Sequence, residues 1–451
     1  MREVNLLDGN IKKALVKMSV PLMGISFVQI TYNLVAMFWL GRYSEDAMAA
    51  VGTASLVGYI GNSLALIGRV GTATWVAQSY GKRNYNDTVQ YIESGIKLNM
   101  IISLIYTVFA LLMMDHFLNL FTLTDIVRTY AKDYMTIQII GMFIVFLNPM
   151  IAVSYNSIGN SVTPFKVSLI GLITNFVLNP ILIFVFKLGI KGSALATVLA
   201  QTAVLITYII AMKRSNMIMS QVNPFTKFSR VRLTNILKIG WPASVQSTAM
   251  ALIAVVLNSF ISRYGSMPIA VFAIGIQIES IGWMTADGFS IAVASFMGQN
   301  LGAENYQRLE DGYKESMKIF AGIGGIAMII LILFGGKLTS LFIPGDPAAM
   351  AEGGRLLAIM GISEILMTVE IGTNGALNGV GLTKFPAVNG LFGNLLRIPI
   401  ALLLMPKLGV LGIWIAISIS MAIKGISAIL AYQYIKRNTE GFRNLSYRRT
   451  E

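Results

Sequence analysis

The chain has no cysteine and a single histidine, His116. Disulfides, thiolate metal sites and paired-histidine metal sites are therefore unavailable, and we expect no metal centre. Charged residues are also scarce, at 12% of 451 residues against 55% hydrophobic ones. Too few polar side chains are present to cover the surface of a soluble protein of this size. The composition predicts a protein of the lipid bilayer.

Long apolar runs separated by short polar breaks predict an all-α integral membrane protein with about twelve transmembrane helices. The N-terminal stretch 1–17 is short and amphipathic and has no cleavage pattern, so we predict no signal peptide. The expected spans are 14–40, 53–77, 96–114, 130–155, 165–186, 192–212, 238–262, 270–297, 316–335, 352–377, 385–405 and 409–433.

The chain matches itself without a gap when it is shifted by 221 residues, so that Gln78 falls on Gln299 and Pro21 on Pro242. The match continues through the pairs Gly81/Gly302, Asn84/Asn305, Tyr85/Tyr306 and Arg42-Tyr43/Arg263-Tyr264. Two duplicated units of six membrane helices each are the predicted result, an arrangement that many secondary transporters share. We call the two units of sequence the first and second repeats.

Most Lys and Arg residues fall in the N-terminus, the C-terminus and alternate loops, including the central stretch 213–238. By the positive-inside rule, both termini and this stretch are predicted to be cytoplasmic, in a multi-pass protein of the cell membrane. The expected domains are an N-terminal lobe (1–212), a cytoplasmic linker (213–237), a C-terminal lobe (238–435) and a basic tail (436–451). Topology accounts for the net charge of +14, so no nucleic-acid partner is expected.

Several segments together resemble multidrug and toxic compound extrusion (MATE) transporters over essentially the whole chain. They are Asn33–Arg42 (NLVAMFWLGR), Ala47–Gly52 (AMAAVG), Asn175–Pro180 (NFVLNP), Gln299–Ala303 (QNLGA) and Gly375–Gly379 (GALNG).

This resemblance implies two six-helix lobes around a central cleft and efflux of small cationic or amphipathic compounds, by a monomer without a cofactor. Inward flow of protons or sodium ions would drive the efflux. The spans 14–40 and 165–186 are most similar to the DinF branch of the family, which implies proton coupling.

Charged side chains within spans are functional candidates, because a central Asp, Lys or Arg costs about 2.5–3.5 kcal/mol even on the mild insertion scale. The second repeat holds them almost exclusively. Glu279 is our first candidate for ion coupling; Asp287, eight residues on and about 80° round a helix, could share its cavity wall, with Glu370 opposite. The alternative for Glu279, Glu364 and Glu370 is a buried structural ion pair with Arg397 or Lys424, and the alternative for Asp287 is a hydrated position near the cytoplasmic third of the membrane. The charged residues of these spans are Glu279, Asp287, Glu364, Glu370, Arg397 and Lys424, against Arg69 and Lys97 in the first repeat.

In the first repeat, Gln29, Asn33 and Ala36 form one helical stripe. The resemblance implies that this stripe lines a cavity, that Ala36 occupies a position normally held by Asp in the proton-coupled branch, and that Pro21 permits a bend. The alternative for Pro21 is that it only marks an early turn of the helix, since Pro242 repeats it. Asn179 likewise stands where the family has an acid. Either coupling lies in the second repeat, or Ala36 replaces the acid.

Three further polar residues, Asn175, Asn179 and Thr197, are candidates for the same cavity. The alternative for such amides is to join helices by hydrogen bonds.

Two other functions stay open at this point. A flippase for lipid-linked or polysaccharide intermediates would suit a more basic cleft, which Arg69, Arg397 and Lys424 would help to form. An enzyme is not expected, since the spans carry no histidine pair, phosphate loop or metal-ligand spacing.

The predicted orientation can be tested by labelling, because the natural chain has no cysteine. Single cysteines placed near Ser215 and Asn438 should resist an impermeant thiol reagent added outside the cell, whereas one near Ser266 should react. External labelling near Ser215 would reverse the predicted topology.

Ala36→Asp tests the first-repeat position. An aspartate there can take up and release a proton and alanine cannot, so the variant should show faster efflux that depends on pH. Efflux of a cationic dye from proteoliposomes measures this. An unchanged rate and pH profile would leave the second-repeat carboxylates as the only candidates.

Overall fold

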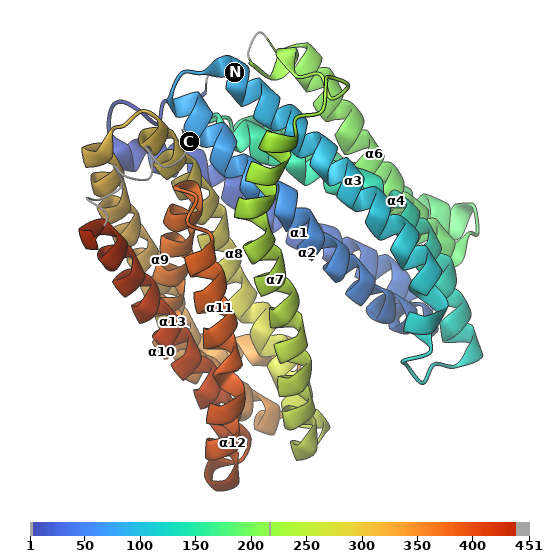
Figure 1. The fold of residues 1–451 in the computed structure, drawn as a ribbon. Helices are drawn as coiled ribbons and strands as arrows, with labels where there is room; N and C mark the ends of the chain where they lie inside the picture. Colours follow the sequence, from blue (N-terminus) through green and yellow to red (C-terminus); the bar gives the residue numbers. More distant parts are fainter. Residues whose placement is uncertain (1–2, 216–217, 439–451) are drawn as a thin grey trace. The chain divides into compact units, whose positions relative to one another are not determined.

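The structure, a computed structural model, describes residues 3–215 and 218–438, and these contain helices and no strands. Twelve helical segments of the described residues, three of them made of two consecutive elements, are long and apolar enough to cross a membrane, which confirms the predicted number of spans. The helices are α1 (Ile11–Tyr43), α2 (Glu45–Gly81), α3 (Tyr85–Leu118), α4 (Asp125–Ser157), α5 (Val162–Pro180), η1 (Ile181–Val185), α6 (Gly189–Lys213), η2 (Ile218–Gln221), α7 (Arg230–Ile261), η3 (Ser262–Tyr264), α8 (Ser266–Gly302), α9 (Tyr306–Ser340), α10 (Pro347–Gly379), α11 (Lys384–Leu395), α12 (Arg397–Leu408) and α13 (Val410–Asn438) (Figure 1).

The duplication persists in the backbone. Helices α2 and α8 each have 37 residues and begin 221 positions apart. Each is followed by the same turn, with a left-handed residue at Arg83 (φ 58°) or Glu304 (φ 56°). Asn84 and Asn305 then cap the next helix through their side chains. The repeated residues therefore fix a repeated turn.

The described chain forms two compact units, and it passes between them three times, once before α1, once within α1 and once within α7. Of the described residues, unit 1 holds those up to Val4 and Gly24–Ser244, and unit 2 holds Asn5–Met23 and those from Val245 onward. The first part of α1, residues 11–23, thus belongs to unit 2, and the first part of α7, residues 230–244, belongs to unit 1.

Close backbone contacts explain why the first part of α1 belongs to unit 2 and the first part of α7 to unit 1. In unit 1, a Cβ on Gly240 of α7 would collide with the carbonyl of Ile67 on α2. In unit 2, a Cβ on Gly288 of α8 would lie 2.9 Å from the backbone nitrogen of Met23 on α1. Glycine permits both contacts because it has no side chain, and such close approach is common between membrane helices.

Arg308 on α9 holds the segment that leads into α1. Its guanidinium donates to the carbonyls of Leu6 (3.1 Å), Asp8 (2.9 Å) and Gly9 (2.8 Å). The segment thus belongs to unit 2, because three charge-assisted hydrogen bonds fix its path.

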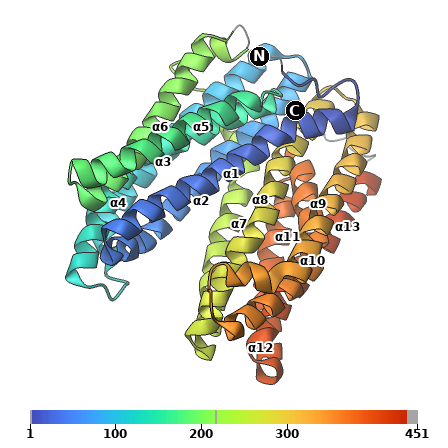
Figure 2. The same ribbon diagram turned by 180° about the vertical axis from the view of Figure 1, so that it is seen from behind.

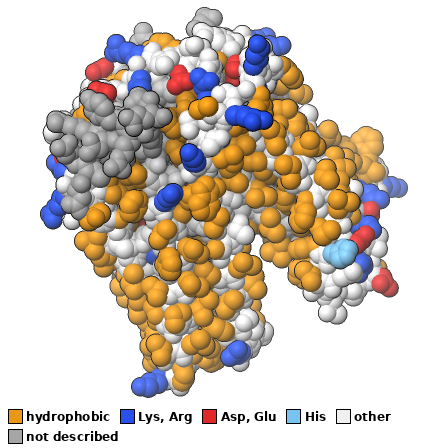
Figure 3. Space-filling model, in the orientation of Figure 1, with side chains coloured by type: hydrophobic (Ala, Val, Ile, Leu, Met, Phe, Trp, Pro, Cys, Tyr) orange, Lys and Arg blue, Asp and Glu red, His pale blue; other side chains and the backbone are white. Residues whose placement is uncertain are grey.

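Within unit 2, α10 is the most buried span and packs on α8, α9 and α13. Within unit 1, α4 packs on α2, α3 and α6; Figure 2 shows the helices from the opposite side. Hydrophobic side chains cover the flanks of the helices, and Lys and Arg are concentrated at helix ends (Figure 3). The protein is a multi-pass membrane protein.

Candidate functional site

An ion pair joins two of the spans at the interior of unit 2. Lys424 of α13 places its Nζ 3.2 Å from Oε2 of Glu370 on α10, and both side chains are buried. Asn374, one turn further along α10, donates to the other carboxylate oxygen at 3.3 Å. The aliphatic stem of Lys424 lies against Gly393 of α11, where a Cβ would collide with it. A lysine reaches Glu370 because α11 has no side chain at this position.

A second cation, Arg397, lies where α11 gives way to α12. Its Nε donates to Oγ of the buried Ser420 on α13 at 3.0 Å. The charge of Arg397 also acts on Glu279 and Glu370. Arg397 and Lys424, the two cations within the spans of the second repeat, therefore belong to one electrostatic cluster.

Two further carboxylates complete the cluster, and neither has an ion-pair partner among the described residues. Glu279 of α8 is buried and feels the charges of Arg397 and Lys424 from beyond ion-pair distance. Glu364 of α10 is fully buried, and neither carboxylate oxygen has a hydrogen-bond partner. A Cβ on Gly282, three residues after Glu279, would lie 3.7 Å from Oε2 of Glu364. We call Glu279, Glu364, Glu370, Arg397 and Lys424 the unit 2 charge cluster.

This cluster holds three carboxylates and two cations. When all five groups are ionised, one negative charge is left over. An unneutralised charge away from water is costly, so the arrangement favours the uptake of one proton or cation. The surplus negative charge is the distinguishing chemical property of the unit 2 charge cluster.

The structure separates Asp287 from Glu279. Both lie on α8, but the side chain of Asp287 is exposed within its unit whereas Glu279 is buried. The angle of about 80° between them is enough to put one into the helix packing and leave the other outside it. Of the predicted coupling residues, Glu279 and Glu370 come together and Asp287 does not join them.

The first repeat has no charge at any of the five equivalent positions. Residues 221 positions before the cluster members are Gly58, Phe143, Pro149, Phe176 and Ala203. The backbone frame is duplicated and the charge is not. Sequence comparison of the two repeats could have singled out all five members as a group.

Polar groups of unit 1 gather around Tyr32 of α1. Its hydroxyl donates to the carbonyl of Thr197 on α6 at 3.3 Å, and the side chains of Gln201 and Asn175 lie near it. The Asn175 amide is fully buried and makes no hydrogen bond of normal geometry. Asn148 of α4 donates to Gln201 at 2.8 Å.

Sequence reasoning missed Tyr32, Asn148 and Gln201. The only sequence feature that could have identified them is a polar side chain inside an apolar span.

Asn179 joins helices. Its Nδ2 donates to the carbonyl of Asn175 at 2.9 Å, and its Oδ1 accepts from Ser193 of α6 at 3.1 Å. The side chain of Gln29 is exposed and that of Ala36 is half-buried within unit 1, while Pro21 lies inside α1 two residues before its crossing point. The side chain of Asn33 is outside the described part of the structure.

Among the described residues, no group of three His, Cys, Asp or Glu side chains could hold a metal ion.

The MatE family model matches residues 21–181 and again residues 242–403. The two matches begin at 21 and 242, so they are offset by the same 221 residues as the internal repeat. The chain belongs to the MATE family.

Relatives support this membership along the full length. The chain is 27% identical to the probable multidrug resistance protein YoeA of Bacillus subtilis, over 92% of this chain and 91% of that protein. It is 25% identical to the probable multidrug resistance protein NorM of Thermotoga maritima, over 90% and 88%. It is 24% identical to the multidrug export protein MepA of Staphylococcus haemolyticus, over 90% of each. This MATE protein is therefore a transporter and not an enzyme.

Solved structures share the fold. One is a MOP superfamily transporter from Pyrococcus furiosus, described as having a binding pocket of reverse polarity that suggests a different function. It is 26% identical to this chain, with a TM-score of 0.87 over 96% of this chain and 97% of that one. An outward-facing MATE transporter gives a TM-score of 0.89 at 24% identity, over 98% and 99%.

Lys424→Met tests the buried ion pair. Removal of the ammonium leaves the Glu370 carboxylate buried without a partner, and we expect a loss of about 3–5 kcal/mol of stability. The double variant Glu370→Gln/Lys424→Met should recover most of it, because neither charge remains. Thermal unfolding in detergent measures both.

Lys318→Gln is the control, since its ion pair with Glu315 is exposed and should contribute no more than about 1 kcal/mol. A Lys424→Met protein as stable as this control would contradict the assignment of a buried pair.

Proposed function

We propose that this MATE protein is a secondary active multidrug exporter that exchanges cationic or amphipathic compounds for inward-moving protons or sodium ions. The observation that carries the proposal is the surplus carboxylate of the unit 2 charge cluster. Glu370 is neutralised by Lys424 at 3.2 Å, while Glu279 and Glu364 have no such partner among the described residues. Because Arg397 is the one other cation of the cluster, it offsets one of these two carboxylates, and the other is available to a transported cation.

Exchange follows from competition for that carboxylate. A proton, a sodium ion or a cationic substrate can each neutralise the surplus charge, and two of them cannot do so at once. A cluster with no bound cation keeps an unneutralised charge away from water, which is costly. The unit therefore favours conformations in which a proton, a sodium ion or a cationic substrate is bound. Alternating access of the site to the two sides of the membrane then couples the ion to the substrate.

The names of relatives support the class of substrate. YoeA is named as a probable multidrug resistance protein and MepA as a multidrug export protein. We propose the same broad specificity here, in a monomer of the cell membrane with both termini in the cytoplasm. The bias of Lys and Arg toward the termini and alternate loops supports that orientation.

A second candidate function rests on the two cations of the cluster. Arg397 and Lys424 could bind an anionic group, such as the phosphate of a lipid-linked intermediate, if Glu370 released Lys424. The Pyrococcus furiosus transporter, with its binding pocket of reverse polarity, indicates that MOP transporters vary in this respect. Transport of cationic dyes by this chain would favour export, and transport of lipid-linked phosphates alone would favour the flippase.

Glu279→Gln is expected to abolish uphill accumulation while the protein stays folded. The amide keeps the shape of the side chain but can neither take up a proton nor bind a sodium ion as a carboxylate does. Dye efflux from proteoliposomes, driven first by a pH gradient alone and then by a sodium gradient alone, measures the loss and identifies the ion.

Glu364→Gln should change the same readout, and Glu315→Gln, on an exposed pair of α9, should leave it unchanged. Full gradient-driven efflux by both Glu279→Gln and Glu364→Gln would refute the proposed role of the cluster. Loss of folded Glu279→Gln protein would assign Glu279 a structural role instead.

A further inference from the structure

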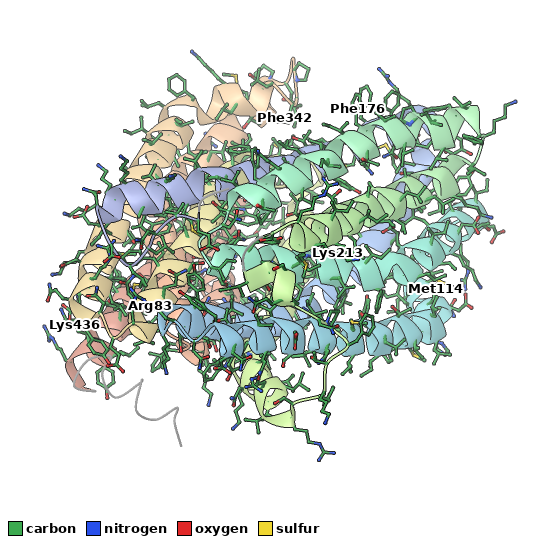
Figure 4. All side chains as sticks on the ribbon, turned by 90° about the horizontal axis from the view of Figure 1, so that it is seen from above. Arg83, Met114, Phe176, Lys213, Phe342 and Lys436 are labelled. Atoms are coloured by element: carbon green, nitrogen blue, oxygen red, sulfur yellow. The ribbon has the colours of Figure 1, made fainter. Side chains whose placement is uncertain are left out.

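A cavity of about 450 Å³ in unit 1 lies between the beginning of α3 and the linker that precedes α7. Its polar lining includes Glu93 and Lys97 of α3, Lys227 and Ser229 of the linker, and Arg232 of α7. The linker starts after Lys213, which is labelled in Figure 4, and ends where α7 begins. The linker connects two membrane-spanning helices, α6 and α7. The cavity beside it therefore lies at the level of the membrane surface.

The linker is held firmly on α3. Glu93 accepts from the backbone of Asn223 at 2.9 Å and from the Thr226 hydroxyl at 2.6 Å. Lys97 donates to the carbonyl and the hydroxyl of Thr226, both at 2.8 Å, and to the Lys227 carbonyl at 3.1 Å. These bonds shape the cavity without a ligand, so it is a preformed site.

The cations of the cavity exceed its anions. Arg232 pairs with Asp87 at 3.0 Å, and Glu93 is buried with hydrogen bonds to both oxygens. Lys97 and the exposed Lys227 form no ion pair among the described residues. The three cations and two carboxylates leave one positive charge at the cavity.

The second repeat provides a contrast. Lys318 occupies the position equivalent to Lys97, and it pairs with Glu315 at 2.6 Å. Lys314, at the position equivalent to Glu93, lies 3.7 Å from Asp311. The two equivalent lysines of α9 thus lie within ion-pair distance of carboxylates, whereas Lys97 and Lys227 do not, and this difference suits the unit 1 cavity to an external anion.

Large apolar side chains project from the linker and from the first turn of α7 beside this charge. Phe225 is 88% exposed, Phe228 is 58% exposed and lines the cavity, and Val231 is 71% exposed. Exposed aromatic side chains next to Lys227 and Arg230 are typical of segments that lie in the membrane interface, where the apolar groups enter the acyl boundary and the cations meet headgroups.

We propose that this cavity binds the phosphate headgroup of an anionic membrane lipid, with Lys227 donating to the phosphate, the charge of Lys97 nearby, and Phe225 and Phe228 contacting the acyl chains. The bound lipid adds to the hydrogen bonds that already hold the linker on α3. The inference concerns lipid binding and does not depend on which solute the protein exports.

The test is a titration of the full purified chain in detergent with short-chain phosphatidylglycerol, monitored by thermophoresis. Phosphatidylcholine of the same chain length and glycerol 3-phosphate are the comparison ligands. We expect phosphatidylglycerol to bind more tightly than both. Lys227→Gln should weaken it about fivefold, since a basic residue near an anionic surface contributes to binding on that scale, and Lys227→Arg should restore it.

Lys318→Gln is the matched control and should bind phosphatidylglycerol like the natural chain. Phe225→Ser/Phe228→Ser should weaken the lipid but not glycerol 3-phosphate. Equal binding of phosphatidylcholine and phosphatidylglycerol, or no effect of Lys227→Gln in folded protein, would overturn the proposal. Equal affinity for glycerol 3-phosphate and the lipid would replace it with a site for a soluble phosphate.

Discussion

The electrostatic cost of charge inside a membrane protein governs the arrangement of unit 2. Five charged side chains on α8, α10, α13 and the α11–α12 junction share one region, and two of them, Glu370 and Lys424, form an ion pair at 3.2 Å. The helices around them are adapted to the pair: α11 has Gly393 where the lysine stem passes, and Asn374 supplies a hydrogen bond to the carboxylate. The remaining surplus of one carboxylate can be neutralised by one proton or other cation.

Duplication supplies the frame for this chemistry and also shows where the two repeats have diverged. Helices α2 and α8 have equal lengths, and the turns after them use the same left-handed position and the same asparagine cap. On this common backbone the second repeat carries the charge cluster, and the first carries Gly58, Phe143, Pro149, Phe176 and Ala203 at the equivalent positions. The charge cluster and the polar packing around Tyr32 therefore occur in different units, although both units follow one architectural plan.

The same divergence appears at the membrane surface. In unit 2, lysines at the beginning of α9 are neutralised by carboxylates one helical turn away. In unit 1, the equivalent part of α3 holds the linker through Glu93 and Lys97, and the cavity beside it keeps a positive charge next to exposed aromatic side chains. The two asymmetries run in opposite directions, since the surplus charge of the interior lies in unit 2 and that of the surface lies in unit 1.

The sequence by itself determined the class of protein, the twelve spans, the duplication and the charged residue types of the second repeat, because apolar length, periodicity and composition are local properties of the chain. It could not decide which carboxylate meets Lys424, that Glu364 has no hydrogen-bond partner among the described residues, or that Asp287 stays exposed while Glu279 is buried. Those outcomes depend on how α10, α11 and α13 pack, and on glycines such as Gly393 that let a distant side chain pass. Tertiary structure also decided that the first part of α1 belongs to unit 2 and the first part of α7 to unit 1. Only packing against α8 and α2, respectively, assigns these parts to their units.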